Sequence, residues 1–259
     1  MIGIFDSGVG GLTVVREVLK QLPNQPIIYF GDTARTPYGN KGPKTIIRYS
    51  QENTDFLLSK GASVIVIGCN TASAVAVEAL REKHPDVPIL EVITPAVSRA
   101  VAVTKNKKIG VIGTRATIAS QIYTKKIQEI DSSIKVFSAA CPLFVPLVEE
   151  NWLTRPETKM IARRYLTDFK NVGIDTLILG CTHYPLLKEV ISAKIGKRVV
   201  LVDSAEEVVK EITNYELRIT NKEGDSKFYF SDLTEQVGKI SARWLGGKVD
   251  LEETNFETK

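Results

Sequence analysis

The chain contains the segments VIVIGCNT, at residues 64–71, and LILGCTH, at residues 177–183. Each is an apolar run that ends in Gly-Cys and continues with small polar residues able to begin a helix. In an α/β protein this pattern places a thiol at the carboxyl end of a buried parallel strand, the edge of the sheet where open α/β folds bind ligands. Cys69 and Cys181 are 112 positions apart (181 − 69 = 112). We therefore predict two thiols that face each other across one substrate, an arrangement suited to chemistry that needs an acid and a base of the same kind.

A second pair of matching segments indicates an internal repeat. IGIFDS begins at residue 2 and IGVIGT begins at residue 109, 107 positions later. Because the two pairs have nearly equal offsets, we predict an α/β protein of two similar lobes, each with a mainly parallel sheet flanked by helices. The active site would lie in the cleft between the lobes. The first lobe would comprise residues 1–95 and 206–259, and the second lobe residues 96–205.

Short β-branched runs alternate with amphipathic segments of helical length, a pattern typical of parallel sheets covered on both faces. The predicted strands cover residues 2–5, 27–30, 64–67, 89–92, 109–112, 135–138, 176–179 and 199–202. The predicted helices cover residues 12–21, 44–60, 72–83, 95–104, 117–130, 155–172 and 184–195.

The C-terminal region has a different pattern. A helix begins near residue 203, and residues 217–220 and 227–230 are predicted to form a β-hairpin that returns to the first lobe. A last helix covers residues 233–245. The tail, residues 250–259, is acidic and polar, and we expect it to be frayed.

The composition is that of a globular protein, with 43% hydrophobic and 25% charged residues among 259. The net charge of +4 is spread over interspersed lysines, arginines and acids, which argues against a nucleic-acid partner. We see no secretory leader, and no apolar run reaches the roughly 18 residues of a membrane span. Three cysteines do not make a disulfide framework, so we expect a cytoplasmic location in which the thiols stay free.

Two polar loops follow the first two predicted strands. DSGVGG, at residues 6–11, places three glycines after a strand, which allows close approach of an anionic ligand to the backbone. Its spacing fits neither the dinucleotide pattern nor a P-loop. Asp6 would be either a cap or a partner in proton transfer. GDTARTPYG, at residues 31–39, is a candidate carboxylate-binding loop, with a plain surface loop as the alternative.

Polar residues directly follow both cysteines of the matching segments. Asn70 and Thr71 follow Cys69, and Thr182 follows Cys181. Backbone amides and hydroxyls at these positions are able to bind a carboxylate and to stabilise a thiolate, so we expect them to lower the thiol pKa from its free value of ~8.5. The alternative is two buried core cysteines; the polar residues beside them argue against it.

One of the two histidines and one acid are further candidates. His183 lies two residues after Cys181 and is placed to assist proton transfer there. Glu149 follows an apolar segment, where a solvated acid at a helix is the alternative. Cys141, the third thiol, is expected to be structural.

Taken together, these segments resemble the glutamate racemases, within the cofactor-independent aspartate/glutamate racemase superfamily. The matching stretches are residues 5–12, 31–35, 37–39, 69–72, 142–149, 180–187 and 202–205. The resemblance extends from residue 2 to about residue 246. It implies interconversion of L- and D-glutamate without a cofactor or metal, with D-glutamate supplied to peptidoglycan synthesis. It also implies a homodimer whose ligand is the small molecule glutamate, with neither nucleic acid nor membrane as a partner.

The resemblance implies roles for individual residues. Cys69 would be the base or acid on the D-glutamate side, assisted by Asp6, and Cys181 its partner on the L-glutamate side, assisted by His183. Glu149 would be a further acid of the cleft. The residues that hold the substrate would be Asp6, Ser7, Tyr38, Gly39, Asn70, Thr71, Thr114, Thr182 and His183.

Three alternatives stay open at this point. The chain would be a racemase for aspartate, another small acid or a hydantoin, or a zinc enzyme that uses Cys69, Cys181 and His183 as ligands. The third alternative is a glutamate-binding module without activity. Against zinc, there is no Cys-x-x-Cys spacing in the chain.

Overall fold

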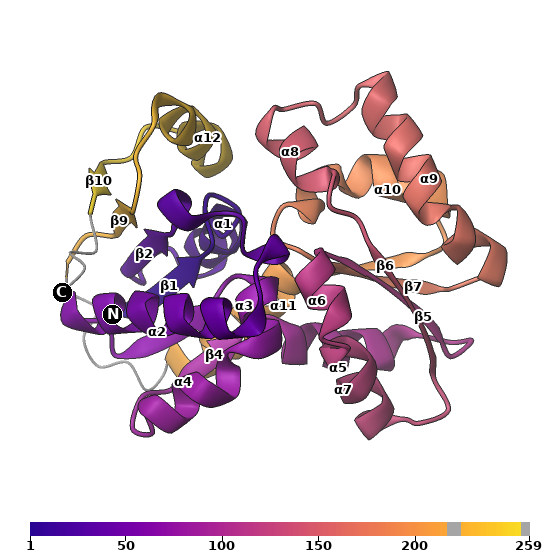
Figure 1. Ribbon diagram of the computed structural model, residues 1–259, viewed down its shortest axis with the longest axis horizontal. Helices are drawn as coiled ribbons and strands as arrows, with labels where there is room; N and C mark the ends of the chain where they lie inside the picture. Colours follow the sequence, from indigo (N-terminus) through magenta and orange to yellow (C-terminus); the bar gives the residue numbers. More distant parts are fainter. Residues whose placement is uncertain (217–223, 255–259) are drawn as a thin grey trace.

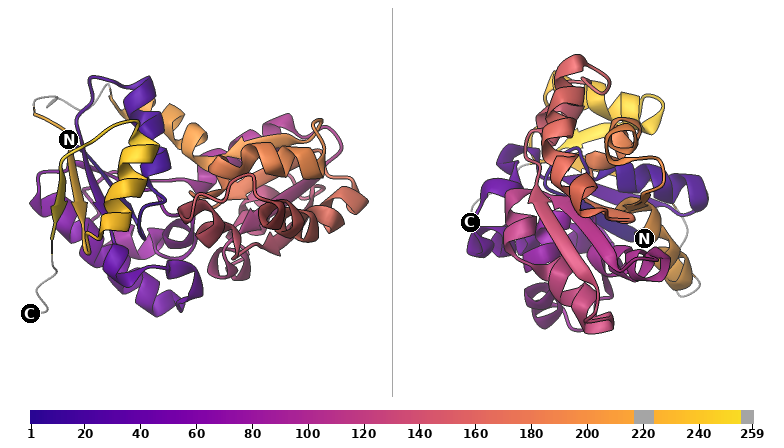
Figure 2. Two further views of the ribbon diagram at one scale, coloured as in Figure 1. Left: turned by 90° about the horizontal axis from the view of Figure 1, so that it is seen from above. Right: turned by 90° about the vertical axis from the view of Figure 1, so that its right-hand side faces the viewer.

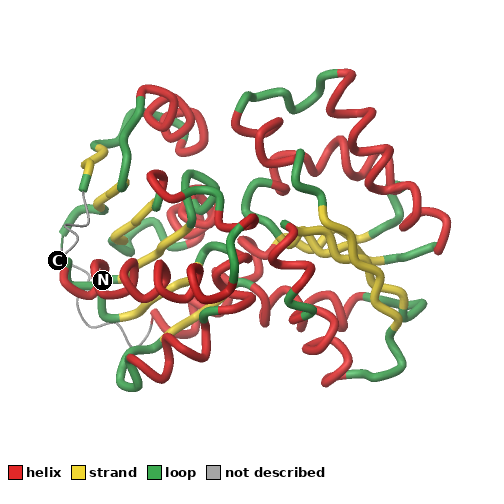
Figure 3. Tube along the Cα trace, in the orientation of Figure 1, coloured by secondary structure: helices red, strands yellow, loops and turns green. Residues whose placement is uncertain are grey.

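The computed structural model describes residues 1–216 and 224–254, and its strands form two parallel sheets (Figure 1, Figure 3). The first sheet has the strand order β10-β9-β2-β1-β3-β4. Its strands are β1 (Ile2–Asp6), β2 (Ile27–Gly31), β3 (Val64–Ile67), β4 (Ile89–Glu91), β9 (Lys227–Phe230) and β10 (Leu251–Glu253). The second sheet has the order β6-β5-β7-β8. Its strands are β5 (Lys108–Gly113), β6 (Lys135–Ala140), β7 (Thr176–Gly180) and β8 (Val200–Asp203).

The two sheets repeat one topology, which confirms the predicted internal repeat. In the first, β1 lies between β2 and β3, with β4 beyond β3. In the second, β5 lies between β6 and β7, with β8 beyond β7, in the same relation. Cys69 follows β3 and Cys181 follows β7, so the two thiols occupy equivalent places in the two halves. All eight predicted strands are present, with ends within two residues of the predicted ones.

Helices flank both sheets. The α-helices are α1 (Leu12–Gln21), α2 (Pro43–Ser59), α3 (Asn70–Val75), α4 (Val77–Lys83), α5 (Ile93–Val103), α6 (Arg115–Ala119), α7 (Ile122–Ile130), α8 (Phe144–Glu149), α9 (Pro156–Val172), α10 (Lys188–Ile195), α11 (Ser204–Glu216) and α12 (Glu235–Leu245). The described part of the chain also contains the short 3₁₀ turns η1 (Thr33–Arg35), η2 (Tyr38–Asn40) and η3 (Tyr184–Leu187). None of the helices in the described ranges is long and apolar enough to cross a membrane.

Alternate residues of the buried strands face different helices, as the pleat of a strand requires. Phe5 and Ile67 pack with the apolar face of α2, in one hydrophobic cluster. Ile4 and Val66 point the other way and pack with α1, in a second cluster. Because both faces are covered, these strands consist of continuous apolar runs, which is why they are recognisable in the sequence.

The two sheets with their helices form two bodies that lie side by side (Figure 2). Helix α11 packs against α1 of the first body and α5 of the second. One hydrophobic cluster runs through these helices from one sheet to the other, so the two bodies share part of their core. The residue boundaries given above for the lobes remain a prediction.

Three predicted helices are each divided in two, and the one predicted over residues 184–195 begins as the 3₁₀ turn η3 and continues as α10. The segment predicted as one helix over residues 117–130 is interrupted at Gln121, which has a left-handed backbone (φ 57). The hydroxyl of Ser120 accepts a hydrogen bond from the N–H of Ile122 at 3.3 Å, at the start of α7. The segment predicted over residues 72–83 is divided at Ala76 into α3 and α4.

The predictions for the C-terminal region are corrected by the sheet. Strand β9 pairs in parallel with β2 on one side and with β10 on the other, so it does not form the predicted hairpin. The other predicted hairpin strand, residues 217–220, lies outside the described residues. The tail is not frayed over Leu251–Glu253, because β10 covers the edge that β9 would otherwise expose and Leu251 packs on the core.

Candidate active site

A cavity of about 390 Å³ lies where the carboxyl ends of the two sheets meet. Its walls come from the loops that follow β1, β2 and β3 of the first sheet and β5, β6 and β7 of the second. All the site residues predicted from the sequence, except Asp6, line it: Ser7, Tyr38, Gly39, Cys69, Asn70, Thr71, Thr114, Glu149, Cys181, Thr182 and His183. The structure thus brings together residues that are up to 176 positions apart (183 − 7 = 176).

Cys69 lies at the start of α3 and is 4% exposed. Its Sγ lies 3.6 Å from Oγ of Ser7. Burial and the negative charge of Asp6 raise the pKa of Cys69 to about 12, and they outweigh hydrogen bonds from Ala72 and Ser7 that act in the other direction. The prediction that polar neighbours lower the thiol pKa is therefore wrong for Cys69, which is a protonated thiol at neutral pH.

Cys181, His183 and Glu149 form a hydrogen-bonded chain. Nδ1 of His183 lies 3.8 Å from Sγ of Cys181, and its Nε2 lies 2.8 Å from Oε1 of Glu149. Burial lowers the pKa of His183, but the hydrogen bonds with Cys181 and Glu149 outweigh it and raise the pKa to about 10. At neutral pH His183 is an imidazolium that donates one N–H to each neighbour.

Asp6 is the last residue of β1 and is not among the residues that line the cavity. Its Oδ1 accepts a hydrogen bond from the N–H of Gly8 at 3.0 Å, and its Oδ2 accepts one from the hydroxyl of Thr182 at 3.4 Å. Burial raises the pKa of Asp6 to about 6. The positive charge of His183 and these hydrogen bonds limit the rise. Asp6 is thus a buried carboxylate that changes protonation close to neutral pH.

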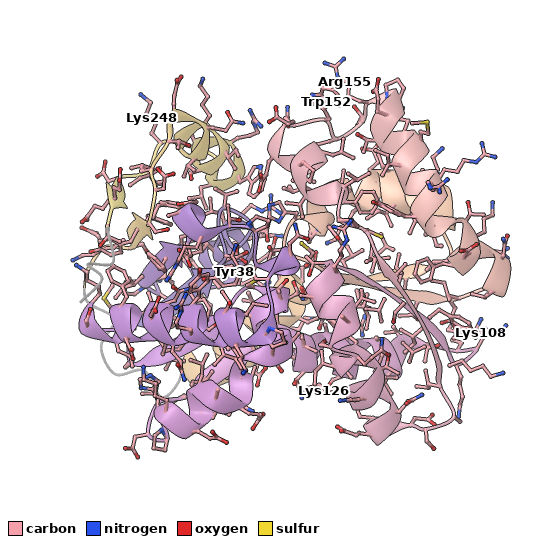
Figure 4. All side chains as sticks on the ribbon, viewed as in Figure 1. Tyr38, Lys108, Lys126, Trp152, Arg155 and Lys248 are labelled. Atoms are coloured by element: carbon pink, nitrogen blue, oxygen red, sulfur yellow. The ribbon has the colours of Figure 1, made fainter. Side chains whose placement is uncertain are left out.

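Hydroxyl groups from both lobes meet at another part of the wall. Oγ1 of Thr71, in the first lobe, lies 2.9 Å from Oγ1 of Thr114, the N-cap residue of α6. It also lies 3.3 Å from Oγ1 of Thr117, within α6. The hydroxyl of Tyr38 is not part of this group. It donates to Asp32 and accepts a hydrogen bond from Nδ2 of Asn53, on α2, at 3.1 Å (Figure 4 labels Tyr38).

Some residues at the cavity were not predicted. Thr36, Asn40 and Arg115 line it, and Nη1 of Arg115 donates to Oδ1 of Asn40 at 3.4 Å across the two lobes. Thr36 and Asn40 lie in or beside the polar loop after β2, and Arg115 follows Thr114. All three are therefore close in sequence to predicted site residues, and this closeness could have identified them. Cys141 is fully buried in the core, in agreement with a structural thiol.

The arrangement does not favour the zinc alternative. Within residues 1–216 and 224–254, no group of three or more histidine, cysteine, aspartate or glutamate side chains is placed so as to hold a metal ion. Cys69, Cys181 and His183 therefore do not form the ligand set that the alternative requires.

The family model described as Asp/Glu/Hydantoin racemase matches residues 2–212. The chain belongs to this family. As a member it is an isomerase, an amino-acid racemase.

Similarity to individual members of the racemase family extends over the whole chain. A glutamate racemase of Geobacter metallireducens is 48% identical, covering 100% of this chain and 97% of the relative. The crystal structure of a glutamate racemase from Bacillus anthracis has a TM-score of 0.94 at 37% identity, covering 100% of this chain and 98% of that one. A glutamate racemase from Francisella tularensis in complex with D-glutamate has a TM-score of 0.92 at 36% identity, with the same coverage. These similarities confirm the α/β fold with two parallel sheets.

Proposed function

We propose that the chain interconverts L- and D-glutamate by proton transfer at the α-carbon between two cysteines, without a cofactor. The observation that carries the proposal is that Cys69 and Cys181, from equivalent loops of the two sheets, line one cavity. Full-length relatives named glutamate racemase, one of them in complex with D-glutamate, support glutamate as the substrate.

The chemistry requires two acid–base groups on opposite faces of the substrate. The α-hydrogen of an amino acid is a very weak acid, so its removal needs a base placed in contact with it. Such placement contributes roughly 7–11 kcal/mol. Racemisation also needs a proton delivered to the opposite face. Donors aimed at the carboxylate, where negative charge develops, stabilise the transition state in the manner of an oxyanion hole; Thr71 and Thr114 are suitable donors at the cavity wall.

Each cysteine acts with its own auxiliary group. Cys181 removes the proton from L-glutamate, with His183 in its imidazolium form beside the sulfur. Cys69, which is a protonated thiol at neutral pH, then delivers a proton to the other face. In the reverse direction Cys69 is the base, and Asp6 assists the loss of its proton. The negative charge of Asp6 raises the pKa of this thiol, so Asp6 assists as the acceptor of the proton and not by stabilising the thiolate.

The proposal includes the biological role and the setting. The D-glutamate produced would be used in peptidoglycan synthesis, and the protein would act as a homodimer in the cytoplasm. These points come from the family resemblance.

The direct test is circular dichroism of purified, EDTA-treated protein with D-glutamate and no added cofactor. We expect the signal of the amino acid to decay to zero as the racemic mixture forms. A flat trace with glutamate and a decaying one with aspartate would assign the other substrate. Activity that returns only with added zinc would favour the metal alternative, and tight glutamate binding without turnover would indicate a binding module.

The protonation states predict a bell-shaped pH profile of kcat/KM. We expect activity to fall below about pH 6, where Asp6 becomes protonated, and above about pH 10, where His183 loses its proton. The Glu149→Gln variant should move the alkaline limb to lower pH, because a neutral amide no longer stabilises the imidazolium. The measurement is kcat/KM between pH 5 and 10.5.

The neighbouring acid provides a matched control. Glu150 is exposed, and Glu150→Gln should leave both limbs in place. An alkaline limb that stays where it is in Glu149→Gln would show that the Glu149 carboxylate does not set the protonation of His183.

A further inference from the structure

Asn70, the residue after Cys69, is bound to the second lobe through its side-chain amide. Its Nδ2 donates to the hydroxyl of Tyr123 at 2.9 Å and to Oγ of Ser204 at 3.3 Å. All three side chains are almost fully buried, with exposed fractions of 2%, 2% and 1%. Hydrogen bonds that are shielded from water in this way are strong and hold a side chain in one orientation.

The same two hydroxyl residues contact the end of the strand that leads to Cys181. A Cβ atom added at Gly180 would lie 3.2 Å from Cε2 and 3.6 Å from Cζ of Tyr123, so the ring lies against this glycine. The hydroxyl of Ser204 donates to the carbonyl oxygen of Leu179 at 3.4 Å. The residue that follows one thiol is therefore joined, through Tyr123 and Ser204, to the residues that precede the other.

We propose that Tyr123, assisted by Ser204, is a positioning residue that holds Asn70, and with it the start of α3 at Cys69, against the strand end that carries Cys181. Tyr123 is not among the residues that line the cavity, so its effect on the reaction passes through its neighbours. Burial raises the pKa of Tyr123 above its ordinary value of 10, so its hydroxyl stays neutral and accepts the hydrogen bond from Asn70.

Positioning of this kind matters because the two thiols act on opposite faces of one carbon atom. A misplacement of about 1 Å in such a site costs on the order of a hundredfold in rate. The inference rests on the proposed function, since it concerns how far apart the two sulfur atoms are held during racemisation.

The test is a double-mutant cycle between Tyr123 and Asn70. Tyr123→Phe keeps the ring against Gly180 and removes the hydroxyl, and we expect kcat/KM for both enantiomers to fall about tenfold, the size of one lost buried hydrogen bond. In the Asn70→Ala background the same substitution should have almost no further effect, because the hydroxyl acts through Asn70. Tyr229→Phe, which removes a hydroxyl from a buried tyrosine of β9, is the matched control and should keep full activity.

Two outcomes would overturn the inference. One is a kcat/KM of Tyr123→Phe within twofold of that of the unsubstituted protein. The other is an equal loss of kcat/KM from Tyr123→Phe with Asn70 present and in the Asn70→Ala background, which a merely structural role would produce. If Tyr123→Phe does not fold, the cycle is run with Ser204→Ala, for which the same non-additivity with Asn70→Ala is expected.

A crystal structure of Tyr123→Phe gives a readout that does not depend on turnover. The amide of Asn70 should rotate away from its place beside the ring, and an unmoved amide would contradict the proposal. If the unsubstituted protein fails to racemise glutamate, the result counts against the proposed function. If the unsubstituted protein is active and Tyr123→Phe has the same kcat/KM, only this inference is removed.

Discussion

Cys69→Ser and Cys181→Ser should each lower kcat by about a thousandfold or more in both directions. Acid–base groups contribute ~10²- to 10⁴-fold to a proton transfer, and an alcohol is a far weaker acid than a thiol. Racemisation in either direction uses both groups, one to remove the proton and the other to deliver one. The loss should therefore be large whichever enantiomer is supplied, and it is measured by circular dichroism of L- and D-glutamate.

Cys141→Ser is the matched control for both variants. Cys141 is as deeply buried as the other two thiols, but its Sγ faces the carbonyl oxygen of Ala139 at 3.8 Å, and the residue is not among those that line the cavity. We expect it to keep nearly full activity. Full activity in either Cys69→Ser or Cys181→Ser would exclude the two-thiol mechanism.

Reaction in D₂O adds an independent readout. The original chain should place deuterium at the α-carbon of the product, because the proton delivered by one thiol has exchanged with solvent. Product without deuterium would exclude a solvent-equilibrated thiol as the donor. This measurement separates proton transfer through the cysteines from a direct internal shift of the hydrogen.

The location of the candidate site was predictable because it follows from the ends of buried strands. Strands β3 and β7 are continuous apolar runs, so their ends at Gly68 and Gly180 are clear in the sequence. In a parallel sheet the carboxyl ends of all strands meet at one edge. Cys69 therefore had to lie near the residues that follow β1 and β2, and Cys181 near those that follow β5 and β6, each at the edge of its own sheet.

Residues whose role depends on contact between distant helices were not predictable. Tyr123 stands in an ordinary amphipathic helix, and only the folded chain places its hydroxyl beside Asn70. The pKa of Cys69 depends on how deeply the thiol is buried and on the nearby charge of Asp6, neither of which a local pattern contains. Strand β10 has few apolar residues, and it forms because β9 offers an edge to pair with.

The largest effect away from the reacting groups is expected for Gly10→Ala, because the loops of the two lobes touch at this glycine. A Cβ atom at Gly10 would lie 2.3 Å from Oγ1 of Thr182 and 2.6 Å from Cε1 of His183. Real Cβ contacts are essentially never shorter than 3.0 Å, so Oγ1 of Thr182 must withdraw by at least 0.7 Å (3.0 − 2.3 = 0.7) and Cε1 of His183 by at least 0.4 Å (3.0 − 2.6 = 0.4). Thr13 holds this loop from the other side, since its hydroxyl donates to the carbonyl oxygen of Thr182 at 2.9 Å.

The clash displaces His183 directly, because its ring is one of the two groups that the new Cβ atom meets. Nδ1 of His183 lies 3.8 Å from Sγ of Cys181, and a shift approaching 1 Å in such groups costs on the order of a hundredfold in rate. We therefore expect kcat/KM of Gly10→Ala to fall about a hundredfold, while the fold is retained because the clash lies between two loops and not inside either sheet. Steady-state kinetics with both enantiomers, together with thermal unfolding, measure the two quantities.

Gly238→Ala provides the control for the substitution itself. Gly238 lies in α12, and a Cβ atom there would meet nothing within 4 Å. Alanine in a helix interior is favoured over glycine by roughly 0.5–1 kcal/mol, so this variant should be slightly more stable and fully active. If Gly10→Ala were as active as Gly238→Ala, the two loops would be able to separate without moving Cys181 or His183. Contact between the lobes at Gly10 would then play no part in placing the second thiol.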